Sequence, residues 1–270
     1  MKSSYVRVDM TFDLLSMDEA LVQKVRALLD KHIVMDDVEV VDCTELGELG
    51  LYGEPQEWAG VIGAEPAMLE ALAPYHHRVV GDVRVARDPS LGGFGFRVFG
   101  ARSRLRSVAE GTTPLGPEAR EIRRVEAGTA RYGLDLDEER LIVEANLEDA
   151  ISFDKGCYLG QEVVVRATAR GRVNRRLMGL VLDRPSERGR KLASAAQPDA
   201  GTLTSVVVSD RFGPIALGYV HRAAIEAGEP LRVEGDGQAV VVPLPFDREA
   251  VEAAQRRISH PSASWRGPSR

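Results

Sequence analysis

The sequence places one of its two cysteines between two glycines, in the stretch KGCYLGQE at residues 155–162. Glycine permits backbone conformations and close approaches that a side chain would block. Gln161 and Glu162 begin a segment whose first helical turn would present unpaired N–H groups. The partial positive charge of such a helix start and the ammonium group of Lys155 both favour the thiolate of Cys157, which is the reactive form. The stretch therefore predicts a reactive cysteine; a packed cysteine in a glycine-bounded turn is the alternative.

The same stretch resembles the K-G-C-(F/Y)-x-G-Q-E signature of the YgfZ family of folate-binding proteins. These are relatives of the T-protein, the aminomethyltransferase of the glycine cleavage system. Seven fixed or restricted positions of the signature agree, and Leu159 falls at the free position. Further similarity to the family lies in RGRVNRRL (170–177), GTLTS (201–205) and ALGYV (216–220). The resemblance extends from about Asp18 to Phe246.

The resemblance implies an α+β fold, with an aminomethyltransferase-like folate-binding domain at 1–170 that ends in the cysteine-motif helix. A small antiparallel β-barrel should follow at 171–250. The residues agree for this second part, because short β-rich runs separated by Gly, Pro and Asp predict such a barrel. These runs are 177–182, 202–209, 215–220, 231–233 and 240–244. Residues 210–214 should form a hairpin turn, and 251–270 are expected to be a disordered tail after a short helical piece.

Other elements are expected from local signals. SMDE (16–19) resembles a capping box and predicts a helix over about 18–32. Pro66 is well placed as the first residue of a helix, and another helix should run over about 117–127. The segment 161–169 contains three successive valines, which suit a strand, but its glycine-bounded start and the resemblance favour a helix. Strands are expected at 38–43, 49–52, 79–85 and 96–99, and a helix at 105–109.

Glu126 is a candidate binding residue. It lies four residues after Ile122, so it shares the inward side of the expected helix while carrying a charge that burial disfavours. A glutamate at the edge of the apolar stripe that reaches solvent is the alternative. VEAG (125–128) resembles the R-x-E-A-G of the T-protein family, whose glutamate hydrogen-bonds the pterin ring. The resemblance therefore implies that Glu126 recognises a pterin, since a carboxylate can accept two parallel hydrogen bonds.

A basic cluster follows the cysteine motif. Five arginines lie within eleven residues that contain no acid, at positions 166, 170, 172, 175 and 176. A solvated helix end and strand start would explain them, because surface arginines are common. The polyanionic glutamate tail of a folate also needs cations at the mouth of its pocket. Direct RNA binding is not expected, because no aromatic residues are interleaved to stack bases.

The resemblance implies that the chain binds tetrahydrofolate or a one-carbon derivative. It also implies a role in assembling or repairing iron–sulfur clusters in client enzymes, including those that thiolate tRNA. It assigns catalytic roles to Cys157 and Lys155, and cofactor contacts to Glu126, Tyr158, Gly156, Gly160, Gln161, Glu162, Arg166 and Arg176. The Cys157 thiolate could attack a one-carbon unit or a thiol adduct, or hold a cluster iron. The alternatives are an aminomethyltransferase and a non-catalytic module that docks a client protein.

The beginning of the chain departs from the family. Full-length relatives carry a further stretch of the folate domain before this point, so a truncated or naturally shortened start is expected. The aspartate that T-proteins use to hold the reacting folate nitrogen should fall near the first strand, where Ser4 or Tyr5 stands. Asp9 is the nearest carboxylate, but its register does not fit. This departure weakens the case for aminomethyl transfer.

Composition indicates a globular protein of one large or two ordinary domains, with 270 residues, 44% of them hydrophobic and 28% charged. No stretch approaches the ~20 apolar residues of a membrane span, and no secretory signal pattern occurs. Cys43 is expected in the core, and the two cysteines predict thiols in the reducing cytoplasm. Neither the two cysteines nor the five histidines have metal-ligand spacing, so no metal site is expected. A net charge of −6 argues against general nucleic-acid coating.

Overall fold

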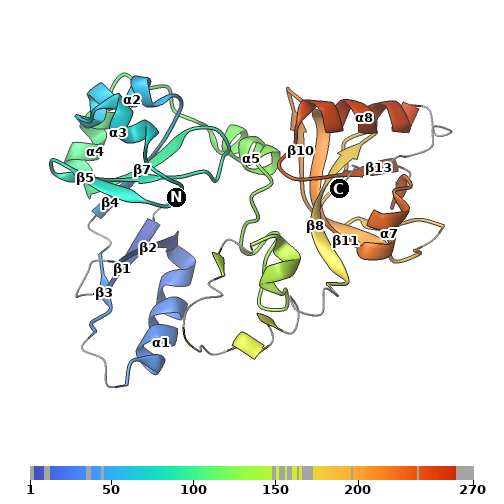
Figure 1. The fold of residues 1–270 in the computed structure, drawn as a ribbon, viewed down its shortest axis with the longest axis horizontal. Helices are drawn as coiled ribbons and strands as arrows, with labels where there is room; N and C mark the ends of the chain where they lie inside the picture. The colour runs from blue at the N-terminus through green and yellow to red at the C-terminus, as the bar shows by residue number, and fades with distance from the viewer. Residues whose placement is uncertain are drawn as a thin grey trace. The chain divides into compact units, whose positions relative to one another are not determined.

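Figure 1 shows the computed structural model of the chain. The structure describes residues 3–8, 13–34, 38–43, 46–147, 150–151, 156, 160–162, 164–165, 173–195, 197–235 and 237–259. The chain divides into two compact units, and each is described by itself below. The first unit comprises Met1–Pro89 and Gly93–Pro114, and the second comprises Ser90–Gly92 and Leu115–Arg270. No helix in the described ranges is long and apolar enough to cross a membrane.

The first unit begins with a small antiparallel sheet in the order β2-β1-β3. Its elements are β1 (Ser3–Val8), β2 (Asp13–Asp18), η1 (Glu19–Leu21), α1 (Val22–His32) and β3 (Val41–Asp42). The helix expected over about 18–32 is confirmed as η1 and α1, but the capping box expected at 16–19 was wrong. Ser16 belongs to β2, and its hydroxyl donates to Glu48 at 2.9 Å instead of capping a helix. Pairing of β2 with β1 over its whole length satisfies the backbone there and outweighs the local capping signal.

A second antiparallel sheet lies within the described stretch 46–147, in the order β4-β7-β6-β5. Its strands are β4 (Leu46–Tyr52), β5 (His77–Val80), β6 (Val83–Arg87) and β7 (Gly95–Ala101), and its helices are α2 (Pro55–Ile62), α3 (Pro66–Glu70) and α4 (Arg102–Ala109). Pro66 begins α3, as expected. The single strand expected over 79–85 is instead the hairpin β5–β6. Cys43 is buried beside Phe99, which confirms its place in the core.

The second unit opens with α5 (Pro117–Glu126) and η2 (Ile142–Ala145). Residues 161–162 and 164–165 are helical, so the described part of the 161–169 segment agrees with the expected helix. Gly128 ends α5, with φ at 71° and its N–H donating to the carbonyl oxygen of Val125 at 2.9 Å. A Cβ atom at Gly128 would lie 2.8 Å from the Leu244 side chain. Glycine therefore serves both the turn and the close approach of the following chain.

The C-terminal barrel confirms the expected fold class. Within the described ranges 173–195, 197–235 and 237–259, six strands close in the order β10-β11-β8-β13-β12-β9, with every neighbouring pair antiparallel. They are β8 (Arg175–Leu182), β9 (Lys191–Ala193), β10 (Gly201–Ser209), β11 (Gly213–His221), β12 (Leu231–Val233) and β13 (Gly237–Val242). The sequence did not indicate β9, because three residues are too few to show an alternating pattern. β9 completes the closure between β10 and β12.

Alternation along the strands divides the apolar side chains into two clusters. One cluster takes residues from all six strands, including Leu180, Leu192 and Leu203, and fills the interior of the barrel. The other takes residues of β8, β11 and β13 together with Val125 of α5 and Val251 of α8 (Arg248–Ser259). Figure 1 shows α8 lying alongside the barrel, and α7 (Arg222–Ala227) following β11. The helical piece expected near the end of the chain is therefore present as α8, packed on the barrel. The expectation of a disordered tail from 251 onward was wrong for residues 251–259, because α8 buries Val251 and Ala254 against the barrel.

Barrel closure predicts a sensitive position at Gly201. A Cβ atom there would lie 2.1 Å from the carbonyl oxygen of Tyr219, so the paired strand would have to shift. We expect Gly201→Ala to destabilise the barrel by about 1–3 kcal/mol, as overpacking does. Urea or thermal unfolding would measure the change. As a control, Gly60→Ala in α2 meets no atom within 4 Å and should gain up to about 1 kcal/mol of helix propensity. Unchanged barrel stability in Gly201→Ala would contradict this account.

Candidate functional site

The end of α5 carries three consecutive buried residues: Arg124, Val125 and Glu126. Successive side chains on a helix point about 100° apart, as 3.6 residues per turn requires. Val125 enters the apolar cluster between α5 and the barrel. The two charged neighbours therefore need polar partners on either side of it, and each partner set comes largely from the barrel or from the loop after α5.

The carboxylate of Glu126 is held by the turn between β10 and β11. Ser209 donates its hydroxyl to Oε1 at 2.6 Å, and Nη1 of Arg211 donates to Oε2 at 3.1 Å. Nη1 of Arg123 lies 3.8 Å from Oε2. The side chain of Glu126 is 7% exposed, whereas those of Arg211 and Arg123 are 55% and 47% exposed. Glu126 is thus a nearly buried anion between a buried hydroxyl and two half-exposed cations.

The β10–β11 turn is itself fixed around Ser209. The Oγ atom of Ser209 accepts hydrogen bonds from the backbone N–H groups of Arg211 at 3.0 Å and Phe212 at 3.1 Å. The guanidinium of Arg211 lies 4.7 Å from the centre of the Phe212 ring. The backbone N–H of Phe246 donates to the carbonyl oxygen of Glu126 at 3.0 Å. The barrel therefore holds both the carboxylate and the main chain of Glu126.

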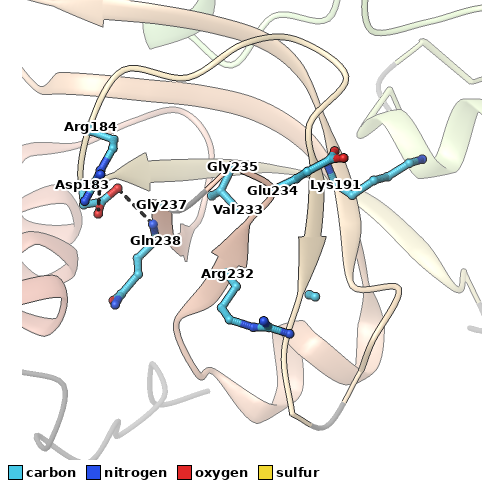
Figure 2. Close-up of a pocket in the computed structure, with 10 residues that line it drawn as sticks. Asp183, Arg184, Lys191, Arg232, Val233, Glu234, Gly235, Gly237 and Gln238 are labelled. Carbon is cyan, nitrogen blue, oxygen red and sulfur yellow. Dashed lines mark hydrogen bonds and ion pairs between the residues drawn. The ribbon is translucent and has the colours of Figure 1, made fainter.

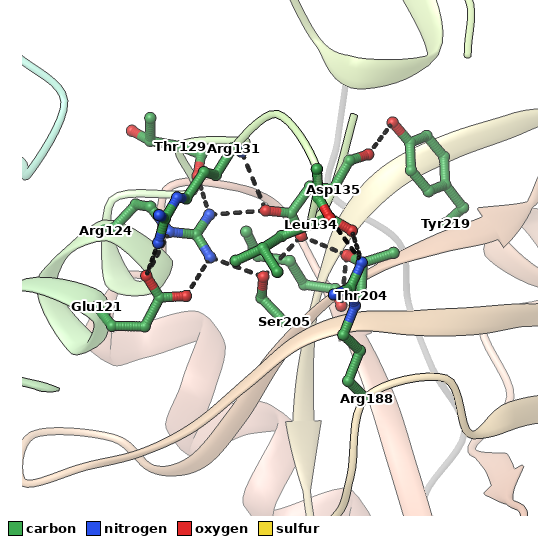
Figure 3. A network of polar contacts seen from close by, with 12 residues as sticks. Glu121, Arg124, Thr129, Arg131, Leu134, Asp135, Arg188, Thr204, Ser205 and Tyr219 are labelled. Carbon is green, nitrogen blue, oxygen red and sulfur yellow. Dashed lines mark hydrogen bonds and ion pairs between the residues drawn. The ribbon is translucent and has the colours of Figure 1, made fainter. Parts of the chain in front are cut away.

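A second network, shown in Figure 3, anchors Arg124. Its guanidinium pairs with Asp135 at 2.8 Å, donates to Ser205 at 2.6 Å and pairs with Glu121 at 2.5 Å. It also donates to the carbonyl oxygen of Thr129. Burial lowers the pKa of Arg124, but the bond with Glu121 and the charge of Asp135 outweigh this and raise the pKa above its ordinary value. The hydrogen bond from Arg124 is the main reason why the pKa of Glu121 is lowered.

A β-bulge in β10 supplies two of the partners of Asp135. The register against β11 shifts between Leu203 and Ser205, so Thr204 is the extra residue. Consecutive residues of a regular strand face opposite sides, but a bulge changes the direction of a side chain. Both hydroxyls, of Thr204 and of Ser205, donate to Oδ1 of Asp135. The bulge thus ties the loop after α5 to the barrel.

Tyr219 of β11 completes the attachment of this loop. Its hydroxyl donates to the carbonyl oxygen of Asp135 at 2.9 Å. Burial raises the pKa of Tyr219 to about 12, so the hydroxyl stays a hydrogen-bond donor at neutral pH. Arg188 donates to the carbonyl oxygens of Gly133 at 3.0 Å and Leu134 at 2.9 Å. Loop and barrel therefore behave as one polar assembly that positions the end of α5.

Sequence-predicted site residues fall into two groups. Glu126 lies in the site just described, and Arg176 lies in β8, paired in register with Val220. Gly156 and Gly160 are exposed, Gly160 has φ at 86°, and Gln161 and Glu162 are helical. The remaining predicted residues lie outside the described part of the chain: Lys155, Cys157, Tyr158 and Arg166. Their roles stay predictions.

Sequence reasoning missed Arg124, Asp135, Ser209 and Arg211 as parts of the site. Ser209 is 83 residues from Glu126, and Asp135 is 11 residues from Arg124. Residues this far apart in the sequence show no periodic pattern that would indicate their contact. The available signal for Arg124 was the R-x-E-A-G resemblance, whose arginine falls at position 124.

A separate hollow of about 480 Å³ lies on the barrel around the β12–β13 hairpin, as Figure 2 shows. Its charged lining residues are exposed and of both signs: Asp183, Arg184, Lys191, Arg232 and Glu234. Asp183 already accepts hydrogen bonds from Arg184 at 3.3 Å and from the backbone N–H of Gln238 at 3.0 Å. None of the predicted site residues that the structure describes lines this hollow, and its mixed charges suit a solvated surface.

Known proteins are similar to this chain both in the barrel and over most of its length. Residues 175–247 match the family model of the glycine cleavage T-protein C-terminal barrel domain. An aminomethyltransferase of Rippkaea orientalis is 32% identical over 216 residues, which cover 76% of this chain and 53% of that protein. One of Rubrobacter xylanophilus is 33% identical over 81% of this chain and 62% of its own length.

The chain is similar to the glycine cleavage T-proteins over most of its length. A putative chloroplastic transferase of Arabidopsis thaliana is also similar, with 34% identity over 52% of this chain and 32% of its own length. The crystal structure of aminomethyltransferase T of the glycine cleavage system from Bartonella henselae has a TM-score of 0.75. The match covers 87% of this chain and 68% of the Bartonella henselae chain at 22% identity, so it shows that the two share a fold. The chain spans between about a third and two thirds of the length of these curated proteins.

The Arg124 network predicts a strong effect of Asp135→Asn. The variant removes one partner of a buried ion pair while keeping the shape of the side chain. We expect a loss of about 3 kcal/mol in the free energy of unfolding, at the low end of the usual range because Glu121 still pairs with Arg124. Urea denaturation would measure it. The control, Asp199→Asn, breaks the pair of Arg175 with a 67% exposed carboxylate and should change stability by less than about 1 kcal/mol. Equal effects of the two variants would contradict a buried anchoring role.

Proposed function

We propose that this chain is a tetrahydrofolate-binding protein of the YgfZ type that supports the assembly or repair of iron–sulfur clusters in client enzymes. The observation that carries the proposal is the Glu126 carboxylate, nearly buried and held by the barrel at the position where the VEAG motif resembles that of the T-proteins. The KGCYLGQE stretch at 155–162 supports the YgfZ type in particular. The chain would act in the reducing cytoplasm, where thiols persist.

The acceptor positions of Glu126 fit the pterin of tetrahydrofolate. A carboxylate offers about four acceptor positions on its two oxygens. Ser209 uses one position on Oε1 and Arg211 uses one on Oε2, so each oxygen retains another. An amino-pyrimidine edge presents two neighbouring N–H donors, and a carboxylate accepts such a pair in parallel. Tetrahydrofolate, when bound, supplies a carrier for one-carbon units.

The remaining residues have roles that follow from their charge. Glu126 would orient the ring, while Arg166 and Arg176 would attract the glutamate tail of the folate. Lys155 would favour the thiolate of Cys157 beside it. That thiolate would act as a nucleophile or as a ligand of cluster iron. The client enzymes and assembly proteins would bind near the cysteine.

Aminomethyl transfer to tetrahydrofolate is the second candidate function. It is favoured by the relatives named aminomethyltransferase, which match 76% and 81% of this chain. Both candidates use the same pterin site and differ in what Cys157 does. Formation of methylenetetrahydrofolate and ammonia from tetrahydrofolate and an aminomethyl-lipoyl carrier, with the dihydrolipoyl thiol left on the carrier, would identify the transferase.

The pterin site predicts that Glu126→Gln weakens tetrahydrofolate binding. Loss of a charge-assisted hydrogen bond costs roughly 1.5–3 kcal/mol, so the Kd should rise about 10- to 150-fold. Calorimetric titration of tetrahydrofolate into the full chain would measure it. The control is Glu118→Gln, an exposed glutamate in the first turn of the same helix, which should leave Kd unchanged. A Glu126→Gln variant with wild-type affinity would remove Glu126 from the site.

The YgfZ type predicts a separate role for Cys157. We expect Cys157→Ala to keep the Kd for tetrahydrofolate, because the pterin contacts lie on Glu126, but to abolish support of cluster-containing client enzymes in cells. Client activity in a strain that lacks the wild-type protein would measure this support. The control is Cys43→Ala, which changes a core thiol and should leave support intact. Full client activity in Cys157→Ala would sink the proposed role of the cysteine.

A further inference from the structure

We propose that Arg211 is a displaceable cover of the Glu126 carboxylate, which leaves when a pterin binds, whereas Ser209 stays in place. The inference rests on the proposed pterin role of Glu126 and adds a control on access to that site. It concerns the two polar partners of the carboxylate in the β10–β11 turn, which differ sharply in how they are held.

Ser209 is anchored in three ways. It is 3% exposed, its hydroxyl donates to Oε1 of Glu126 at 2.6 Å, and its oxygen accepts two backbone N–H groups. Moving it would leave buried donors of the turn without an acceptor, which is costly. Ser209 therefore sets the orientation of the carboxylate whether or not a ligand is present.

Arg211 is held much more weakly. Its side chain is 55% exposed, and it reaches Glu126 through one contact at 3.1 Å. Its guanidinium also lies over the Phe212 ring, at 4.7 Å from the ring centre. An ion pair of this exposure is worth little because water competes for both groups. The long side chain can swing into solvent without disturbing the turn, since its backbone N–H still donates to Ser209.

Arg211 and the pterin would compete for the Glu126 carboxylate, because both present hydrogen-bond donors to it. A guanidinium is a planar array of N–H donors, and so is the amino-pyrimidine edge. Acceptor positions remain on the carboxylate, but only 7% of the Glu126 side chain is exposed. The ring edge therefore needs the space that the exposed partner occupies. Arg123, 3.8 Å from the same oxygen, would keep a positive charge beside the carboxylate after Arg211 has moved.

The test is a titration of tetrahydrofolate into the full chain, comparing wild type with Arg211→Met. Methionine keeps apolar length over Phe212 and removes the N–H donors. If Arg211 covers the carboxylate, the variant should bind about two- to fivefold more tightly, the factor expected from losing a half-exposed ion pair. Arg232→Met, which changes an exposed arginine of β12, is the control and should leave Kd unchanged. A Kd that is unchanged or raised in Arg211→Met would overturn the cover.

Two further variants separate this inference from the proposed function. In the Glu126→Gln background, Arg211→Met should have no effect on Kd, because the two residues act through one contact. Ser209→Ala should weaken binding, whereas substitution of a residue that only covers the carboxylate would not.

If Glu126→Gln binds as tightly as wild type, the pterin role of Glu126 fails. If Glu126→Gln weakens binding but Arg211→Met does not strengthen it, only the cover fails. If Arg211→Met binds tetrahydrofolate and the wild type does not, the cover is supported. If neither the wild type nor Arg211→Met binds it, the cover is overturned.

Discussion

The buried pair of Arg124 and Asp135 is the interaction on which the rest of the second unit depends. Both side chains are nearly inaccessible, with exposures of 8% and 0%, so their removal from water must be compensated. Hydrogen bonds from Thr204 and Ser205 satisfy the carboxylate, and Glu121 shares the guanidinium. The pair joins the end of α5 and the loop after it to the same strand of the barrel.

This constraint explains how Glu126 acquires a defined position. Arg124 fixes one side of the helix end, Val125 packs into the apolar cluster, and Glu126 is left facing the β10–β11 turn. A bulge near the beginning of β10 serves Asp135, and the turn at the end of β10 serves Glu126. One strand therefore supports both charged residues. The barrel is part of the candidate site. Substitutions in the β10–β11 turn should therefore change ligand affinity as much as substitutions in α5 do.

The first unit also contains a partly buried arginine that pairs with two carboxylates. Arg97 of β7 pairs with Asp88 at 2.9 Å and with Glu48 at 3.2 Å, and it also donates to Ser16 at 3.2 Å. Burial lowers the pKa of Arg97, but the charges of Asp88 and Glu48 outweigh it and raise the pKa. Ser16 is therefore occupied by a contact between two sheets, although its local sequence is typical of a helix cap.

The sequence by itself determined the elements whose signal is local. Runs of β-branched residues indicated five barrel strands, and proline indicated the start of α3. The VEAG and KGCYLGQE motifs directed attention to Glu126 and Cys157. Tertiary structure decided the rest, because the reasons lie between distant residues. β9 exists because the barrel must close, and β2 replaced a helix cap because β1 pairs with it. Arg211 reaches Glu126 across 85 residues, a contact that no pattern along the chain could indicate.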